Sequence, residues 1–329
     1  MKKDWPENIE KELDGAPEGR MLLRRHPGCR GEEEPGFALP ADGRGKAELF
    51  SLFPGVELAF IRCCSGRILC CHEAAGNVLE INHCRNGRAG WSMKGGNAVY
   101  LGAGDLAVHS RGCCADSEMN LPLGYYEGLS LSVELPVLSR DGPALLREAG
   151  VSGESLFRKF CGSGPVSLPA SRELDAVFEM LYHAPEAVRL PYYRVKAQEI
   201  LLYLFAAAVP EPAASGSYSA QQAELVKEIH DLLTQNLEKR FTIEELSRRF
   251  PINASSLKAA FKNVYGMPIA TYMQEYRIRQ AMKLLRSTDD SIAEIAAAVG
   301  YESQSRFTGI FKKAVHLLPS DYRKLYRGV

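Results

Sequence analysis

An imperfect internal repeat in the last third of the chain restricts its fold more than any other feature. Residues 246–252 (LSRRFPI) recur as residues 295–301 (IAAAVGY), and residues 257–262 (LKAAFK) recur as residues 307–312 (FTGIFK). Each copy predicts a short helix, a tight turn and a second helix. This is the helix-turn-helix pattern, in which the second helix is placed to enter a DNA major groove.

Capping residues mark where the helices of this region begin and end. A Ser or Thr followed three residues later by Glu or Gln can satisfy backbone donors that the first turn leaves open. Such capping boxes stand at residues 219–222, 242–245 and 291–294. Asn253 and Ser303 are further expected N-caps, and Gly266 and Gly300 are expected helix stops. The sequence therefore predicts an all-helical region from Ser219 to Val329.

Both expected second helices, residues 254–264 and 304–314, have an apolar stripe and a polar face. Short polar side chains flanked by lysines suit base edges and phosphates. An ordinary amphipathic helix with a solvated face is the alternative, and two copies in register favour DNA binding over it. The residues expected to contact DNA are Ser255, Ser256, Lys258, Ala259, Lys262, Gln304, Ser305, Arg306, Thr308, Lys312 and Lys313.

The order of these motifs resembles the AraC family of transcription regulators over about a hundred residues. The pattern is carried by residues 277–285 (RIRQAMKLL), residues 291–313 and residues 319–323 (PSDYR). The resemblance implies two helix-turn-helix units joined by a long helix, here about residues 269–286, that reach successive major grooves. Three positions depart from the family pattern: His316 replaces the usual glycine, Leu318 the usual threonine, and Gly309 a larger contacting side chain.

The rest of the chain has a different residue pattern. Hydrophobic residues make up 46% of the sequence and charged residues 24%, which excludes a disordered or fibrous chain. Short β-type runs separated by glycine recur between residues 56 and 133, as in a small barrel or sandwich. The expected fold is α+β and multidomain, with four parts: an N-terminal extension that is partly ordered (1–52), a cupin-like β-barrel (53–170), a helical dimerisation segment and linker (171–218) and an AraC-type DNA-binding domain (219–329).

Charge and cysteine usage add weaker indications. From Ser219 onward there are 17 Lys and Arg against 12 Asp and Glu, an excess of five positive charges in a chain whose 40 basic and 40 acidic residues balance. A basic module joined to an acidic one suits a polyanionic partner. No apolar run is long enough for a signal peptide or a membrane span, so a cytoplasmic location is expected. The nine cysteines are expected to be reduced and mostly buried, with redox or metal sensing as the alternative.

Family members commonly carry a cupin-like barrel before the DNA module, and two cupin-like motifs are present. The first includes Gly66, His72, Glu80 and Gly87, and the second is residues 96–105. In metal-binding cupins three histidines and a glutamate converge. Here only His72 and Glu80 match those positions, and two ligands do not complete a transition-metal site. We therefore expect no metal, no other cofactor, no catalytic residues and no enzymatic activity.

What remains is a pocket for a small molecule in the mouth of the expected barrel. The candidate ligand-binding residues are Arg67, His72, Glu80, Arg85 and Trp91.

A helix is also expected at residues 192–208. Its apolar seam, formed by Val195, Leu202, Phe205 and Val209, suits packing along a partner helix.

The sequence thus indicates a transcription regulator, an activator by its family, that is controlled by a small-molecule effector. The expected partners are double-stranded DNA, the effector, a second copy of the chain in a homodimer, and RNA polymerase. Three alternatives stay open: a regulator whose barrel only dimerises, a metal-dependent cupin enzyme fused to a DNA-binding module, and a cysteine-based repair protein fused to the same module. The cysteine spacing disfavours the last of these.

Overall fold

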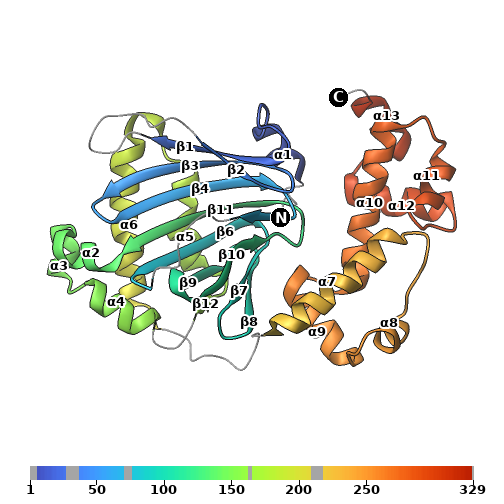
Figure 1. Ribbon diagram of the computed structural model, residues 1–329. Helices are drawn as coiled ribbons and strands as arrows, with labels where there is room; N and C mark the ends of the chain where they lie inside the picture. The colour runs from blue at the N-terminus through green and yellow to red at the C-terminus, as the bar shows by residue number, and fades with distance from the viewer. Residues whose placement is uncertain (1–5, 27–36, 70–75, 162–164, 209–217, 328–329) are drawn as a thin grey trace. The chain divides into compact units, whose positions relative to one another are not determined.

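The computed structural model describes residues 6–26, 37–69, 76–161, 165–208 and 218–327. The chain forms two compact units, Met1–Ala220 and Gln221–Val329 (Figure 1). The first unit is rich in β-strands and the second is helical, so the predicted α+β multidomain class is confirmed. No helix among the described residues has both the length and the apolar character that a membrane span requires.

The first unit contains two sheets. Neighbouring strands are antiparallel, except that β1 runs parallel to β3. In spatial order, the eight-stranded sheet consists of β12 (Val166–Leu168), β9 (Leu106–Ser110), β6 (Val78–Gly87), β11 (Tyr126–Glu134), β4 (Val56–Cys64), β3 (Arg44–Phe53), β1 (Arg20–His26) and β2 (Phe37–Pro40). The five-stranded sheet consists of β13 (Tyr218–Ser219), β8 (Asn97–Leu101), β7 (Ala89–Met93), β10 (Cys114–Asn120) and β5 (Arg67–Leu69). The β-rich part is thus a pair of sheets, and their closure into a cupin-like barrel stays a prediction.

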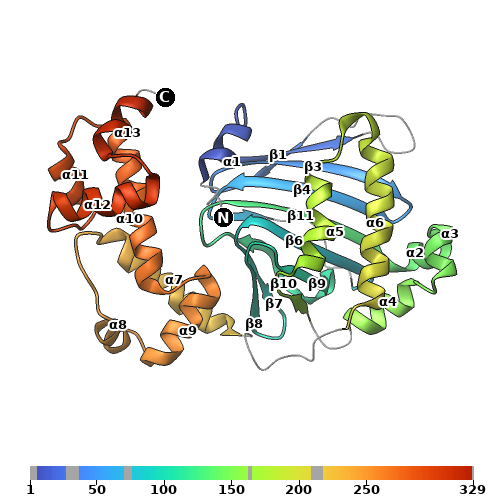
Figure 2. The same cartoon turned by 180° about the vertical axis from the view of Figure 1, so that it is seen from behind.

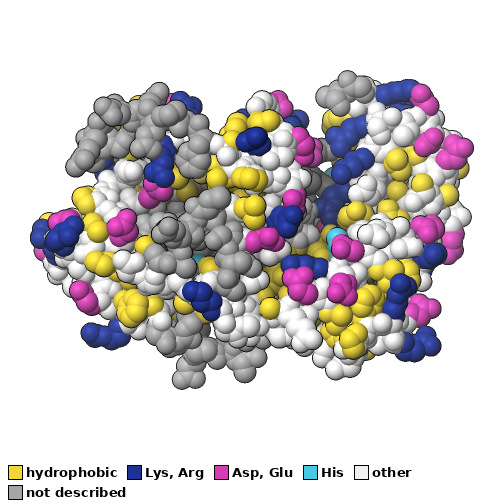
Figure 3. Space-filling view, in the orientation of Figure 1, with side chains coloured by type: hydrophobic (Ala, Val, Ile, Leu, Met, Phe, Trp, Pro, Cys, Tyr) yellow, Lys and Arg dark blue, Asp and Glu magenta, His cyan; other side chains and the backbone are white. Residues whose placement is uncertain are grey.

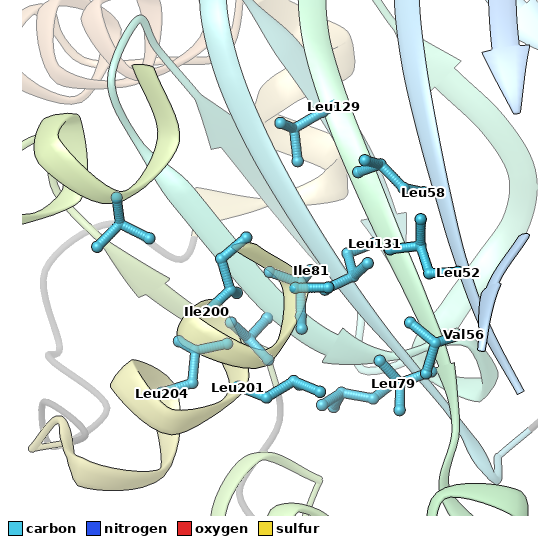
Figure 4. Packing of buried hydrophobic residues seen from close by; sticks show 14 of the residues in the cluster. Leu52, Val56, Leu58, Leu79, Ile81, Leu129, Leu131, Ile200, Leu201 and Leu204 are labelled. Atoms are coloured by element: carbon cyan, nitrogen blue, oxygen red, sulfur yellow. The ribbon is translucent and has the colours of Figure 1, made fainter. Parts of the chain in front are cut away.

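Two helices cover one face of the eight-stranded sheet, α5 (Arg172–Tyr182) and α6 (Arg189–Ala206) (Figure 2). Successive side chains of a strand point to opposite faces, so Leu79 and Ile81 of β6 pack toward the helices, whereas Glu80 and Asn82 face the other sheet. Figure 4 shows apolar side chains of the sheet against those of α6. A second core, which includes Met21, Trp91 and Met119, fills the space between the sheets.

Shorter elements complete the first unit. They are α1 (Pro6–Glu12), α2 (Leu135–Asp141), α3 (Ala144–Glu148), α4 (Gly153–Phe160) and the 3-10 helices η1 (Arg111–Cys113) and η2 (Glu186–Val188).

The boundaries of this unit differ from those that the sequence indicated. The expected extension of residues 1–52 supplies β1, β2 and β3 to the large sheet, and the segment of residues 171–218 supplies the two helices that cover it. Neither is a separate part, because each buries its apolar face against the same sheet. The expected division at residue 219 lies next to the boundary between the two units.

The helical seam proposed for dimerisation is also divided in the structure. Leu202 and Phe205 are half-buried and pack against the core of the first unit, while Val195 is 61% exposed. Val209 lies outside the described residues. A helix that lies on a sheet buries a wider stripe than a helix in a two-stranded seam, and the sheet takes most of this one.

The described residues of the second unit form seven helices. They are α7 (Ala220–Gln235), α8 (Ile243–Arg249), α9 (Ala254–Tyr265), α10 (Ile269–Ser287), α11 (Ile292–Ala298), α12 (Gln304–Val315) and α13 (Pro319–Tyr326). The capping boxes of Thr242 with Glu245 and of Ser291 with Glu294 are confirmed, and so are the N-caps Asn253 and Ser303. The long joining helix predicted at about residues 269–286 is α10.

The helix ends show what two of the departures from the family pattern do. Gly266 ends α9 with a φ of 79°, and His316 ends α12 in the same left-handed region with a φ of 63°. A side chain is rarely held there, because its Cβ crowds the following carbonyl. Leu318 makes no capping hydrogen bond at the start of α13, where a threonine hydroxyl could have made one.

The burial of α6 gives a test of the first unit. Replacing the fully buried Leu201 with alanine should lower the free energy of unfolding by about 2–5 kcal/mol, because it opens a cavity between helix and sheet. Val195→Ala on the same helix is the matched control and should cost less than about 0.5 kcal/mol. Urea denaturation followed by tryptophan fluorescence measures both, since both tryptophans precede residue 220. Equal losses in the two variants would contradict the orientation of α6.

Candidate DNA-binding surface and ligand cavity

The two copies of the repeat have the same internal packing. Phe261 of α9 lies edge-on to Tyr272 of α10, with ring centroids 5.6 Å apart and an angle of 74° between the planes. Phe311 of α12 meets Tyr322 of α13 at 5.6 Å and 76°. Both phenylalanines are fully buried, so each second helix is held against the following helix by the same contact.

This packing leaves the opposite faces of α9 and α12 open. Of the eleven residues predicted to contact DNA, all but the half-buried Ser256 and Thr308 are exposed. Ser255 donates a hydrogen bond from its hydroxyl to the Asn253 side chain (2.7 Å), which also accepts from the backbone N–H of Ser256 (2.9 Å). The surface that these residues form is called the DNA-binding surface below. The space-filling view of Figure 3 shows Lys and Arg side chains together with acidic and apolar ones on one side of the second unit.

Gly309 lies in the middle of this surface, on α12. A Cβ at this position would meet no atom within 4 Å, so packing within the protein does not require glycine here. Glycine in a helix interior costs about 1 kcal/mol relative to alanine.

The helix α10 lies between the two copies of the repeat in the chain, and it also contacts the loop between α7 and α8. Arg277 of α10 donates hydrogen bonds to the carbonyl oxygens of Leu237 (2.7 Å) and Lys239 (3.1 Å), which lie between α7 and α8. Burial lowers the pKa of this guanidinium, but an arginine keeps its charge at any physiological pH. The charge-assisted bonds fix the segment that leads into the first helix-turn-helix.

In the first unit, a cavity of about 190 Å³ lies between the two sheets. Its polar lining comes from three adjacent strands, β9, β6 and β11, and from η1, which follows β9. Its apolar lining comes from β4, β3, β1 and β2 of the same sheet and from the opposite sheet. The polar residues are Glu80, Asn82, His109, Arg111, Ser130 and Ser132, and the apolar ones include Leu23, Leu39, Leu49, Ile61, Trp91 and Met119.

Glu80 is the centre of the polar half. Its carboxylate pairs with the guanidinium of Arg111 through Nη2 and through Nε at 2.8 Å. It also accepts hydrogen bonds from the hydroxyls of Ser130 (2.9 Å) and Ser132 (2.9 Å). Strand register explains the cluster, because Ser132 and His109 are the cross-strand partners of Glu80 on its two sides.

Asn82 and His109 form the second polar contact in the cavity wall. The Asn82 amide nitrogen lies 3.2 Å from His109 Nε2, and His109 Nδ1 lies 3.1 Å from the carbonyl oxygen of Ser110. The carbonyl can only accept, so Nδ1 carries the proton and Nε2 accepts from the amide. Burial lowers the pKa of His109, which keeps the ring uncharged at neutral pH.

The structure places the predicted ligand-binding residues in different locations. Glu80 and Trp91 line the cavity. Arg67 does not: it pairs with Asp42 (2.6 Å) and Glu118 (3.4 Å), and its side chain is half exposed. Arg85 lies on the helix-covered face of β6, because it is an odd number of residues from Glu80 and therefore points the other way. His72 lies outside the described residues.

Arg85 has a structural role at that position. It pairs with Glu127 (3.2 Å) and Glu179 (3.4 Å), and its guanidinium lies 4.5 Å from the centre of the Tyr182 ring. These contacts join β6 and β11 to α5. Arg85 is a candidate ligand-binding residue by sequence, but strand alternation assigns it to the face opposite the cavity.

Several cavity residues were not predicted: Asn82, His109, Arg111, Ser130 and Ser132. The alternation of Ser130 and Ser132 with three leucine and valine residues in residues 129–133 was the available signal, since it marks two polar side chains on the inner face of a buried strand. Among the described residues, no three His, Cys, Asp or Glu side chains are arranged to hold a metal ion.

A match to a protein family lies within the second unit. Residues 246–325 match the family model described as a helix-turn-helix domain. The HTH-type transcriptional activator RhaR of Mannheimia succiniciproducens is 31% identical over 101 residues, which are 31% of this chain and 37% of that protein. The melibiose operon regulatory protein of Escherichia coli is 32% identical over 100 residues, 30% of this chain and 33% of that protein. The chain therefore matches little more than a third of the length of these relatives.

Among solved structures, the C-terminal domain of the two-component response regulator yesN from Fusobacterium nucleatum is similar. It is 30% identical and covers 32% of this chain and 99% of that chain, with a TM-score of 0.29.

The carboxylate of Glu127 gives a prediction for stability against pH. Burial alone would raise the pKa of Glu127, but the hydrogen bond from Asn86 and the charges of Arg85 and Arg62 outweigh it and lower the pKa below 4.5. A carboxyl with a lowered pKa stabilises the fold above its unfolded pKa, and this contribution is lost as the pH falls through the folded value.

Glu127→Gln should therefore lower the free energy of unfolding by about 2 kcal/mol at neutral pH and flatten its decrease below about pH 4.5. Denaturant titrations at a series of pH values measure both quantities. Glu186→Gln is the control, because the Glu186 side chain is 88% exposed, and it should keep the wild-type slope. A Glu127→Gln variant with an unchanged acid dependence would show that the three partners do not stabilise the carboxylate.

Proposed function

We propose that this chain, whose C-terminal domain is a helix-turn-helix domain of the AraC type, is a sequence-specific DNA-binding transcription regulator controlled by a small-molecule effector in its first unit. The observation that carries the proposal is the pair of helices α9 and α12. Both have exposed polar faces in the same register, and both are held by the same Phe–Tyr contact. A chance amphipathic helix has no reason to be repeated with its packing.

The residues of the DNA-binding surface divide into two groups. Gln304 lies in the first turn of α12, where an amide can make paired hydrogen bonds to an adenine edge. Ser255 and Lys258 lie on the corresponding face of α9. Lys262 and Lys312 lie two turns further along their helices, where we assign them to phosphates.

The proposal predicts different effects for the two groups. Gln304→Ala should cost about 1–3 kcal/mol of binding and relax the sequence preference at one or two base pairs. Lys312→Ala should weaken binding to all sequences alike and reduce the salt slope by about one unit, because one phosphate contact is lost. Selection of fragments from a random DNA pool, followed by titration at several salt concentrations, separates these results.

Lys94→Ala serves as the control, because it removes the same charge from an exposed site in the first unit. It should leave both the sequence preference and the salt slope unchanged. If Gln304→Ala lowered binding to every sequence equally, the assignment of Gln304 to a base would be wrong.

A second prediction concerns spacing on the DNA. The two helix-turn-helix motifs lie on one polypeptide, so they should read half-sites about one helical turn apart, near 10 base pairs. Inserting about five base pairs between the half-sites turns the second groove to the opposite side of the duplex. The affinity for DNA should then fall to that of a single helix-turn-helix motif. If the affinity is unchanged by the insertion, only one helix-turn-helix motif reads DNA. Because Gly309 has no side chain to contact a base, α12 is then the helix expected to bind more weakly.

The first unit supports the effector part of the proposal through the cavity between its sheets, which a domain that only dimerises does not need. The alternative of a metal-dependent cupin enzyme finds less support, because Glu80 is already engaged by Arg111, Ser130 and Ser132. Metal analysis of the purified protein decides between these two functions. We further propose that the chain acts as a homodimer in the cytoplasm, activates transcription and contacts RNA polymerase, as the family resemblance implies.

A further inference from the structure

The cavity between the sheets is polarised along the order of its strands. Its polar side chains come from β9, β6 and β11, and the next strands in the sheet, β4, β3, β1 and β2, contribute apolar side chains. The opposite sheet adds Ile68, Trp91 and Met119. A molecule that fills the cavity must therefore present one polar end and one apolar body.

The described side chains of the polar end have no net charge. The guanidinium of Arg111 is matched by the carboxylate of Glu80, and the two serine hydroxyls donate to the same carboxylate. A ligand carboxylate at Arg111 would either displace Glu80, which leaves a buried carboxylate without its partner, or lie beside Glu80, where the two negative charges repel each other. A ligand ammonium would need Glu80 and would leave Arg111 in the same condition.

Asn82 provides a hydrogen-bonding site for the ligand that does not involve the Glu80–Arg111 ion pair. Its amide nitrogen donates to His109 Nε2, which fixes the orientation of the amide and leaves its oxygen to accept. No described residue donates a hydrogen bond to this oxygen, and the uncharged ring of His109 adds no charge to the site.

We infer that the cavity binds an uncharged amphipathic molecule, with an apolar body against β4, β3 and β1 and a neutral hydrogen-bonding group at Asn82. This inference rests on the proposed function, because it specifies the chemical class of the effector. A polyhydroxylated ligand such as a sugar would bury hydroxyl groups against Leu23, Leu49 and Ile61 without partners, and each unpaired hydroxyl is costly.

Three probes with the same apolar chain test the charge requirement: octanamide, octanoate and octylammonium. Isothermal titration calorimetry of each into the full chain at about pH 7 gives the three affinities. Octanamide should bind at least about tenfold more tightly than either charged probe, a difference of about 1.4 kcal/mol. Equal or tighter binding of octanoate or octylammonium would overturn the inference, and so would the absence of binding by all three.

Two variants locate the polar end. Asn82→Leu should weaken octanamide at least about tenfold. Asn86→Leu is the matched control, because it is the same exchange on the same strand at a residue that bonds Glu127 outside the cavity, and it should leave the affinity unchanged. An octanamide affinity that Asn82→Leu does not alter would place the polar group elsewhere and overturn the assignment to Asn82.

Glu80→Gln provides a gain of function. It leaves Arg111 without its counter-charge, so octanoate should become the preferred probe and should raise the melting temperature of the variant more than octanamide does. This readout holds even where the variant alone is less stable, since a ligand that binds the folded state restores stability. An unchanged preference for octanamide would show that the ion pair does not set the charge of the ligand.

Failure of this inference is distinguishable from failure of the proposed function. The calorimetry contains no DNA, and selection of DNA fragments by the wild-type chain requires no probe. Selective DNA binding without an octanamide preference removes the inference and leaves the regulator. An octanamide preference without selective DNA binding removes the regulator and leaves the ligand site.

Discussion

Everything in the second unit depends on one contact made twice, the edge-on packing of a buried phenylalanine against a buried tyrosine. The Phe261–Tyr272 and Phe311–Tyr322 pairs have the same centroid distance, 5.6 Å, and nearly the same angle. A helix of twelve residues is marginal in isolation, so α9 and α12 owe their position to this packing. Fixing the buried face also fixes the exposed one, because residues of a helix keep their angular spacing. The two faces that we propose to read DNA are therefore a consequence of the core.

In the first unit the corresponding constraint is the alternation of side chains along β6 and β11. Leu79, Ile81, Leu129 and Leu131 form a dry layer under α5 and α6, and this leaves the residues between them to face the other sheet. A carboxylate on that inner face needs a partner, since a lone buried charge is expensive. Arg111 and two serines meet this need for Glu80. The polar end of the cavity therefore follows from the position of Glu80 on the inner face of β6, where its carboxylate needs partners.

How far the sequence predicts this molecule depends on whether the signal is local. Capping residues and helical periodicity are local, so Thr242, Asn253, Ser291 and Ser303 marked the starts of four helices, and the exposed faces of α9 and α12 followed. The cavity depends on which strands become neighbours, and a single sequence does not show that. Arg111, which was not among the predicted ligand-binding residues, belongs to a 3-10 turn and reaches Glu80 only through the β6–β9 pairing. The partial burial of the α6 stripe was not predicted for a similar reason, because an apolar stripe does not reveal whether a sheet or a second helix covers it.

An effector can control DNA binding only if it binds two states of the chain with different affinity. The connection from the cavity to the second unit therefore matters as much as the cavity. Trp91 of β7 lines the cavity and is paired with Val99 of β8, and β8 is paired with β13 through Ala98 and Tyr218. The strand β13 leads directly into α7, and the backbone N–H of Ala220 donates to the carbonyl of Gly96 beside β8 (2.8 Å). β13 has only two residues, Tyr218 and Ser219. The edge strand β13 thus joins the sheet behind Trp91 to α7, so the backbone path from the cavity to the second unit runs through the pairing of β8 with β13.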